Sequence, residues 1–299
     1  MKFTKILCAI DFSPASTHAL RMATNLAKAS ECELVIAHSW HLPALYYSEL
    51  AFPSNAVDAM VEGTEAELAK ASREATSAGV ARVSTLLLEG VPAKTIVDAL
   101  EADPAFDLVV LGANGRSGLG RVLMGSVAEK LVRLAPCSVL AIHATHALGA
   151  FRNILCPVDF SETSLDAVEL ALRLLEPGGD GLTLLHVLDL PLNYSVYPEA
   201  SAFVSELDMK STSHLDAIIT APTTKAAAAK ATIKKSTRIG NPGRQILAML
   251  ESEPRYDLVV MGTHGRTGLR RVVLGSVAEK VVRNASCPVI VVRKRMPSA

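Results

Sequence analysis

The sequence predicts an α/β protein of two tandem domains, each a doubly wound sheet of five parallel strands. Short apolar runs alternate with helix-like stretches, which is the pattern of a parallel sheet covered by helices on both faces. The chain also repeats itself, because FDLVVLGANGRSGLGRVLMGSVAEKLVRLAPCSVLAI returns as YDLVVMGTHGRTGLRRVVLGSVAEKVVRNASCPVIVV. A duplication of this length in 299 residues predicts two domains, which we place at residues 1–146 and 151–299.

The first half begins with the apolar run Ile6–Ile10, which is typical of a short buried strand. Ser13-Pro14 then supplies the N-cap and the first residue of a helix. That helix carries an apolar stripe of Ala19, Leu20, Ala23, Leu26 and Ala27. Further strands are expected at 34–38, 83–88, 107–111 and 139–142, further helices at 57–77, 93–100 and from 126, and a loop at 40–56.

The second half repeats this order after a short linker at 144–152. Its first helix follows Ser161, and its apolar face is predicted to comprise Leu165, Val168, Leu172 and Leu175. Strands are expected at 154–158, 182–186, 231–238, 257–261 and 289–292.

Residues 200–240 depart from the repeat. They are rich in Lys, Ser, Thr and Ala, and their strand lacks the apolar run seen at 83–88. We expect an altered or mobile segment here. Its lysines form either a solvated basic face or a local site for an anion or a partner; they are Lys225, Lys230, Lys234 and Lys235.

The composition excludes several classes of partner. Lys and Arg together number 30, as do Asp and Glu, so no whole-protein field attracts nucleic acid or an anionic membrane. Aromatic residues make up only 4%, which disfavours a base-stacking surface. No apolar run approaches the length of a membrane span. We therefore expect a soluble cytoplasmic protein with no nucleic-acid or membrane partner.

The five cysteines do not form a recognisable framework. Their number is odd and no CxxC pair occurs. We expect buried thiols in a reducing compartment.

A glycine-rich loop occurs once in each half. Residues 112–115 (GANG) are followed after nine residues by Gly125-Ser126, and residues 262–265 (GTHG) are followed by Gly275-Ser276 with the same spacing. Each loop leaves an apolar strand and enters a helix. Glycines let a backbone approach a ligand closely, and a helix start presents unpaired N–H groups, so this arrangement predicts a phosphate-binding loop.

A carboxylate closes the first strand of each half. Asp11 and Asp159 lie at the carboxyl ends of these strands, where ligands bind in doubly wound sheets. If the first and fourth strands are neighbours, each carboxylate faces the same crevice as the glycine loop of its own half.

These motifs resemble the ATP-binding branch of the universal stress protein family, and the resemblance covers both halves. It implies the adenine nucleotide α-hydrolase-like fold in two tandem copies related by a pseudo-twofold axis. It also implies ATP as the ligand, with or without Mg²⁺. The aspartates would contact the ribose hydroxyls. The residues just before them, together with Ser39 or Val187, would contact the adenine. The glycine loops would hold the ribose and the phosphates. In the first half the implied residues are Ala9, Ile10, Asp11, Ser39, Gly112, Gly115, Gly125, Ser126 and Val127. In the second half they are Pro157, Val158, Asp159, Val187, Gly262, Gly265, Gly275, Ser276 and Val277.

Plainer interpretations of the same residues stay open. The glycines could form simple turns, Ser126 and Ser276 could be helix caps, and the two aspartates could complement helix dipoles. His38 and His186 are more typical of structural hydrogen-bonding residues than of ligands. The HxxH spacings at 38–41 and 143–146 have no partner that completes a metal set, so we assign no metal. The loop arginines could pair with phosphates or be solvated; they are Arg116, Arg121, Arg266, Arg270 and Arg271. His264 replaces Asn114 and fits the family pattern better.

Three functions fit the motifs. The first is a nucleotide-dependent regulator of the stress response, acting through conformation or a partner. The second is a slow ATPase or a phosphoryl or nucleotidyl transferase, although no GxxxxGK[ST] loop or carboxylate pair supports it and we assign no catalytic residue. In the third, one half binds ATP and the other is structural or binds another ligand. The apolar fifth strands are edges that need covering. The resemblance implies that the two domains pair there within the chain, and a homodimer of the whole chain is a further option.

Overall fold

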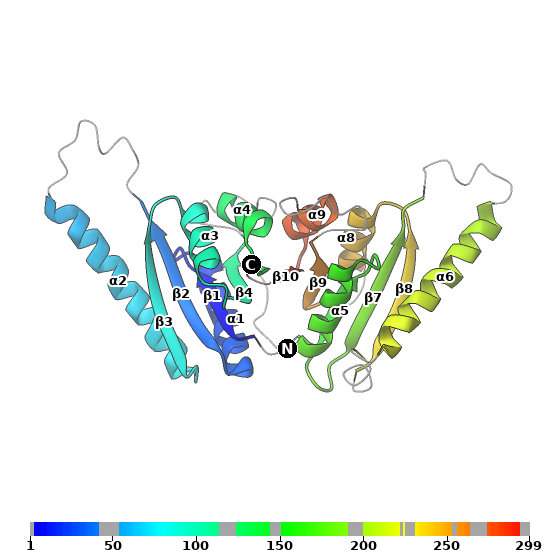
Figure 1. The fold of residues 1–299 in the computed structure, drawn as a ribbon, viewed down its shortest axis with the longest axis horizontal. Coiled ribbons are helices and arrows are strands. Elements are labelled where there is room, and N and C mark those ends of the chain that lie inside the picture. The colour runs from blue at the N-terminus through cyan, green and yellow to red at the C-terminus, as the bar shows by residue number, and fades with distance from the viewer. Residues whose placement is uncertain are drawn as a thin grey trace, which may run out of the picture. The chain divides into compact units, whose positions relative to one another are not determined.

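The computed structural model describes residues 3–41, 54–113, 124–143, 151–190, 200–221, 224, 231–252, 256–263 and 274–293. These residues fall into two compact units, one ending at residue 143 and the other beginning at residue 151. Figure 1 shows both, and each is described by itself. The predicted loop residues 42–53, linker residues 144–150, Lys225 and Lys230 lie outside the described residues.

The first unit is a parallel sheet with the strand order β3-β2-β1-β4-β5. Its strands are β1 (Lys5–Ala9), β2 (Glu33–Trp40), β3 (Arg82–Glu89), β4 (Leu108–Gly112) and β5 (Ser138–Ile142). Its helices are α1 (Pro14–Ser30), α2 (Ser54–Ser77), α3 (Pro92–Ala102) and α4 (Ser126–Leu134). Because crossovers between parallel strands are right-handed, this order puts α1 and α2 on one face and α3 and α4 on the other.

The second unit repeats the arrangement with the order β8-β7-β6-β9-β10. Its strands are β6 (Asn153–Pro157), β7 (Gly181–Leu188), β8 (Ile233–Ile239), β9 (Leu258–Gly262) and β10 (Val289–Val292). Its helices are α5 (Glu162–Leu174), α6 (Ala200–Thr220), α8 (Pro242–Ser252) and α9 (Ser276–Asn284). The predicted fold class, two tandem doubly wound domains, is confirmed.

The first helix of each unit begins as its sequence predicts. The Ser13 hydroxyl accepts a hydrogen bond from the Ser16 N–H at 3.2 Å, and Ser161 accepts one from Ser164 at 3.3 Å. Such caps satisfy a backbone donor that has no partner inside the helix.

The apolar stripes were predicted well for α1 but only in part for α5. All five predicted residues of α1 are buried. In α5, Val168 and Leu172 are buried, but Leu165 is 38% exposed. The small residues Ser164, Ala167 and Ala171 complete the buried face instead, and Ser164 lies close to Gly262.

The expectation of an altered segment at 200–240 holds for the connection between α6 and β8, which spans 221–232 against 78–81 in the first unit, but not for the helix and the strand themselves. Helix α6 takes the place of α2, and β8 pairs with β7 from Ile233 to Ile239. A strand at the edge of a sheet has only one neighbour, so β8 needs no continuous apolar run. Lys234 and Lys235 are exposed, and Lys235 pairs with Asp216 of α6 at 2.6 Å.

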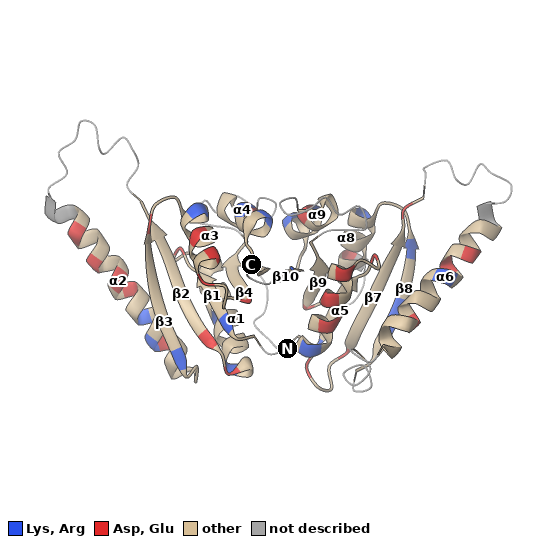
Figure 2. Ribbon diagram, in the orientation of Figure 1, with Lys and Arg blue, Asp and Glu red and all other residues tan. Residues whose placement is uncertain are grey.

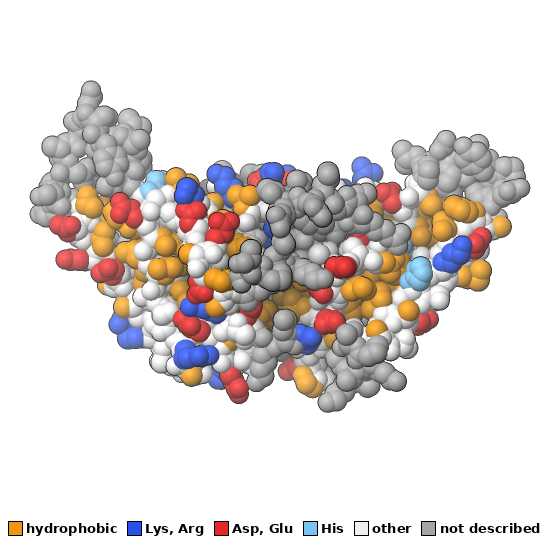
Figure 3. Space-filling model, in the orientation of Figure 1, with side chains coloured by type: hydrophobic (Ala, Val, Ile, Leu, Met, Phe, Trp, Pro, Cys, Tyr) orange, Lys and Arg blue, Asp and Glu red, His pale blue; other side chains and the backbone are white. Residues whose placement is uncertain are grey.

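Residues of both charge signs are distributed along the helices (Figure 2). Among the described residues on the face in Figure 3, no extended area carries one sign of charge, which agrees with the balanced composition. Within the described ranges, no helix combines the length and apolar character that crossing a membrane requires.

All five cysteines are buried with free thiols, as their predicted role as small apolar residues requires. Burial raises the pKa of the Cys32 thiol to about 11 and that of Cys287 to about 12. Burial also raises the pKa of Cys8 and Cys156.

Candidate nucleotide-binding site

The carboxylate and the glycine loop of each unit meet at the same edge of the sheet. In the first unit β1 and β4 are hydrogen-bonded neighbours with Ala9 opposite Leu111, so Asp11 and Gly112 both follow that register pair. In the second unit β6 and β9 pair in the same way, which places Asp159 near Gly262. The predicted neighbourhood of first and fourth strands is confirmed in both units.

A cavity of about 270 Å³ lies at this edge in the second unit. Eight of the nine residues implied for this half line it, and the ninth, Gly265, lies outside the described residues. The eight are Pro157, Val158, Asp159, Val187, Gly262, Gly275, Ser276 and Val277. Residues implied from separate segments of sequence are therefore brought together around one space.

The sequence analysis missed part of the lining. Pro242 and Ile246 come from α8, Leu185 from β7 and Met261 from β9. Ile246 is 2% exposed, so the apolar face of α8 could have been found from its helical periodicity. The remaining additional residues are Ser164, Thr263 and Ala278.

The lining combines an apolar region with backbone donors. Val158, Leu185, Val187, Ile246 and Met261 supply hydrocarbon surface. The start of α9 supplies backbone N–H groups, and one carboxylate, from Asp159, is present. Such a cavity suits a ligand with a flat apolar part, hydroxyl groups and an anionic end.

The helices behind the glycine loops begin without a side-chain cap. Gly125 and Gly275 are the N-cap residues of α4 and α9, and neither contributes a side-chain hydrogen bond. Ser126 and Ser276 are the first helical residues, so their interpretation as N-caps is wrong. The first N–H groups of each helix point along its axis without intrahelical partners, which favours an anion at this end.

A backbone hydrogen bond ties each loop at its base. The Gly125 N–H donates to the Ala113 carbonyl at 2.7 Å, and the Gly275 N–H donates to Thr263 at 2.9 Å. The strand end and the helix start are thereby held together, independently of the loop sequence between them.

Gly112 and Gly262 are required by packing against the preceding helix. A Cβ at Gly112 would lie 2.9 Å from the backbone carbon of Ala15 and 3.1 Å from the Ser16 nitrogen. A Cβ at Gly262 would lie 2.7 Å from the Thr163 hydroxyl and 3.0 Å from the Ser164 nitrogen. Packing against the preceding helix therefore favours glycine at both positions, independently of any ligand.

The two aspartates hold the turn that leads into the first helix of each unit. Asp11 Oδ1 accepts from the Ser13 N–H at 3.0 Å, and Asp159 Oδ1 accepts from the Ser161 N–H at 3.0 Å and its hydroxyl at 2.6 Å. The intervening Phe12 and Phe160 have left-handed backbones, with φ of 61° and 65°. This conformation costs a non-glycine residue about 1–2 kcal/mol, and such strain is concentrated at functional sites.

The two strand-end histidines have the structural role expected of them. His38 Nδ1 donates to the Ile10 carbonyl and His186 Nδ1 to the Val158 carbonyl, each at 2.7 Å. Their rings lie 4.6 and 4.5 Å from those of Phe12 and Phe160. Each histidine thus fixes the backbone immediately before the aspartate.

The units differ at the end of their second strands. The Ser39 hydroxyl donates to the Gly90 carbonyl at 3.0 Å and lies 3.0 Å from the Thr95 hydroxyl. Val187, its counterpart, presents an apolar side chain to the cavity. The loop residues Gly115, Asn114 and His264, and the five loop arginines, lie outside the described residues.

The model of the universal stress protein family matches residues 2–143 and again residues 150–293. The chain belongs to the universal stress protein family. It contains two copies of the family domain in tandem, as its internal repeat predicts.

Relatives of the chain include other universal stress proteins. One from Methanocaldococcus jannaschii is 33% identical and is aligned over 48% of this chain and 83% of its own length. One from Mycobacterium tuberculosis is 30% identical over 71% of this chain and 69% of its own length. A crystal structure of a universal stress protein from Archaeoglobus fulgidus covers 99% of this chain and 100% of its own, with a TM-score of 0.69 and 21% identity. That likeness supports the fold of the whole chain.

Proposed function

We propose that this universal stress protein binds an adenine nucleotide, ATP, in its second unit and acts as a nucleotide-dependent regulator. The observation that supports this most strongly is the cavity of about 270 Å³, since eight residues implied by the family motifs line it together.

The lining suits each part of the nucleotide. Val158 and Ile246 provide hydrocarbon surface for the adenine ring. Asp159 accepts hydrogen bonds and so suits the ribose hydroxyls. The N–H groups at the start of α9 suit the phosphates, because Gly275 leaves that end without a side-chain cap.

Binding is favoured over catalysis by the charge of the lining. Among the described residues around the cavity, Asp159 is the one charged side chain, and it is already bonded to Ser161. A single engaged carboxylate provides neither a pair for Mg²⁺ nor a free base for water. The nucleotide would therefore act by stabilising the conformation that binds it.

The test is the nucleotide content of gently purified protein, released by denaturation and counted by chromatography. Ser276→Glu puts a carboxylate at the start of α9, where it repels phosphate but remains compatible with the helix dipole. We expect it to remove one ATP per chain. Ser126→Glu makes the same change in α4 and is the matched control, which leaves the nucleotide of the second unit in place.

Two results would overturn the proposal. One is that no nucleotide co-purifies and that added ATP does not bind at millimolar concentration. The other is that Ser276→Glu, with an unchanged circular dichroism spectrum, retains the full nucleotide content.

A further inference from the structure

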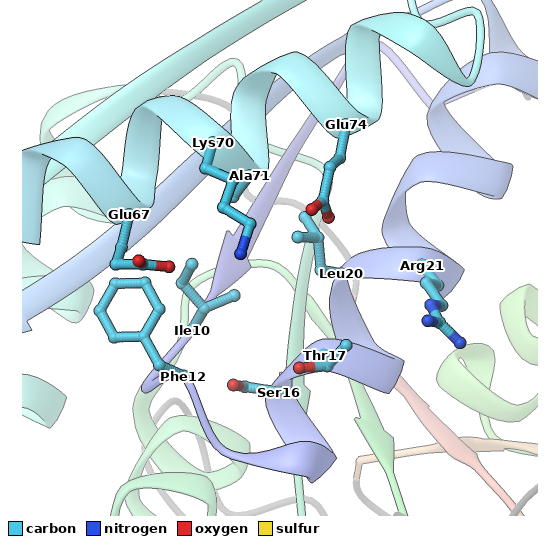
Figure 4. Close-up of a pocket in the computed structure, with 10 residues that line it drawn as sticks. All are labelled: Ile10, Phe12, Ser16, Thr17, Leu20, Arg21, Glu67, Lys70, Ala71 and Glu74. Atoms are coloured by element: carbon cyan, nitrogen blue, oxygen red, sulfur yellow. The ribbon is translucent and has the colours of Figure 1, made fainter.

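The first unit contains a second cavity that the nucleotide proposal does not use. It lies between α1 and α2 and has a volume of about 270 Å³ (Figure 4). We call it the α1–α2 pocket; its lining is Ile10, Phe12, Ser16, Thr17, Leu20, Arg21, Glu67, Lys70, Ala71 and Glu74. The nucleotide cavity of the second unit borders α8 and α9, the counterparts of α3 and α4, and the two linings share only two equivalent positions, Ile10 with Val158 and Ser16 with Ser164.

The base of the α1–α2 pocket is apolar. Ile10, Leu20 and Ala71 are at most 8% exposed and form its buried part. Phe12 is 37% exposed, and its ring lies along one side of the pocket beneath Glu67 (Figure 4). The pocket therefore offers an aliphatic floor and an aromatic ring to an apolar group.

Four charged side chains surround this apolar base without neutralising one another. They are Arg21, Glu67, Lys70 and Glu74. Across the described chain, none of their side chains forms an ion pair or a hydrogen bond. The ammonium group of Lys70 instead extends from α2 toward Ile10 (Figure 4).

This absence of pairing is unusual for the chain. Helical residues four apart on one face commonly pair, and Lys94–Asp98, with the same order of charges as Lys70 and Glu74, does so at 2.5 Å. Arg173–Glu169 and Lys210–Glu206 pair at 3.0 and 2.6 Å. The charges of the α1–α2 pocket thus remain available to a ligand.

The hydroxyl groups in the pocket act as acceptors. Ser16 and Thr17 both donate to the Ser13 carbonyl, at 3.0 and 3.2 Å. Their remaining capacity is to accept a hydrogen bond. With Glu67 and Glu74 they suit a bound ammonium group, whereas Lys70 and Arg21 suit a carboxylate.

We propose that the α1–α2 pocket binds a zwitterion with an apolar body, namely a free α-amino acid with an aliphatic or aromatic side chain. Its ammonium and carboxylate groups face the two signs of charge, and its side chain covers Phe12 and the aliphatic floor. A phosphate-bearing ligand is disfavoured because two carboxylates line the space. The volume is just below the range of about 300–1,000 Å³ typical of drug-sized ligands, which suits a smaller molecule.

The second unit lacks the same combination. There the His214 ring of α6 packs edge-on against Phe160 at 5.1 Å. The residues matching Thr17 and Arg21 in the repeat are Leu165 and Glu169, and Glu169 is already paired with Arg173. The proposal therefore requires one amino-acid site per chain.

Equilibrium dialysis of the full chain against L-leucine and L-phenylalanine tests this. We expect one molecule per chain. We also expect binding weaker by about tenfold or more for phenethylamine, which lacks the carboxylate, and for 3-phenylpropionate, which lacks the ammonium group. We expect added ATP to leave this stoichiometry unchanged, because the proposed ATP site lies in the second unit, and this comparison separates the two proposals.

Variants identify the pocket. Ala71→Leu fills the pocket and should abolish binding, while Lys70→Gln should weaken it without altering the fold, because this side chain is exposed. Arg73→Gln removes a charge from α2 outside the lining and is the matched control. The proposal is overturned if neither amino acid binds at millimolar concentration, if two bind per chain, if the singly charged analogues bind equally well, or if Lys70→Gln and Arg73→Gln bind alike.

Discussion

The two units share the hydrogen bonds and the backbone conformation at the turn before the first helix, but they differ in the side chains exposed around that turn. Both have an aspartate bonded to the turn before the first helix, a left-handed phenylalanine and a histidine bonded to a backbone carbonyl. In the first unit Phe12 borders an open pocket, whereas in the second Phe160 is covered by His214. The difference teaches that the fold fixes the shared edge of the sheet, while the helical surface beside it can diverge.

The largest expected effect tests whether the shared glycines serve packing in both units. Gly112→Ala should destabilise the protein by about 1–3 kcal/mol, because the new Cβ meets the backbone of Ala15. Gly262→Ala should cost a similar amount relative to the parent protein, because its new Cβ meets backbone atoms of Thr163 and Ser164 at 3.0 Å. Urea unfolding of each variant measures the difference.

Gly63→Ala is the control for this comparison. Gly63 lies in α2, and nothing within 4 Å would meet its Cβ. Alanine is there expected to stabilise the helix by up to about 1 kcal/mol. Equal stability of all three variants would contradict the packing argument.

The second prediction concerns the two histidines. His38→Ala and His186→Ala each leave a buried carbonyl without its donor, which should cost about 1–3 kcal/mol. His186→Ala should also weaken ATP binding, since Val158 lines the cavity. Thermal unfolding and a nucleotide titration separate the two effects. Loss of stability in His38→Ala alone would show that the hydrogen bonds of the two histidines do not contribute equally to stability.

The third prediction concerns the N-caps of α1 and α5, for which we expect a smaller loss of stability and a difference between the two units in ATP binding. Ser13→Ala and Ser161→Ala each remove an N-cap, which is worth about 1 kcal/mol. The Ser161 hydroxyl also donates to Asp159 at 2.6 Å, so only Ser161→Ala should in addition weaken ATP binding in the second unit. Calorimetric titration of the two variants checks this, and identical affinities would count against a positioning role for Ser161.

The smallest expected effect concerns the lysine-rich edge strand. Asp216→Asn removes the partner of Lys235, but both side chains are partly exposed, so the loss should be at most about 0.2–1 kcal/mol. High salt should abolish the difference from the parent protein. A larger change in the urea midpoint would show that β8 depends on its charges more than the rest of the unit does.

The sequence was sufficient for the fold, because apolar runs, caps and the repeat are local signals. The implied residues that line the cavity came from the resemblance of the motifs to the family. The sequence was insufficient for Pro242 and Ile246, whose contribution depends on where α8 packs over the sheet. It misplaced Leu165, because the buried face of α5 includes Ser164, Ala167 and Ala171 in its place. It also missed the α1–α2 pocket, since the absence of an ion pair at Lys70 is visible only in three dimensions.

The hydrogen bond from Gly275 to Thr263 has a consequence for engineering. Because the strand end and the helix start are already joined, the segment between them closes a loop whose ends do not depend on its composition. Ligand preference could then be transferred by exchanging residues 264–273 with 114–123, which leaves the buried Leu274 in place. Duplicated domains built this way can acquire new specificities one loop at a time.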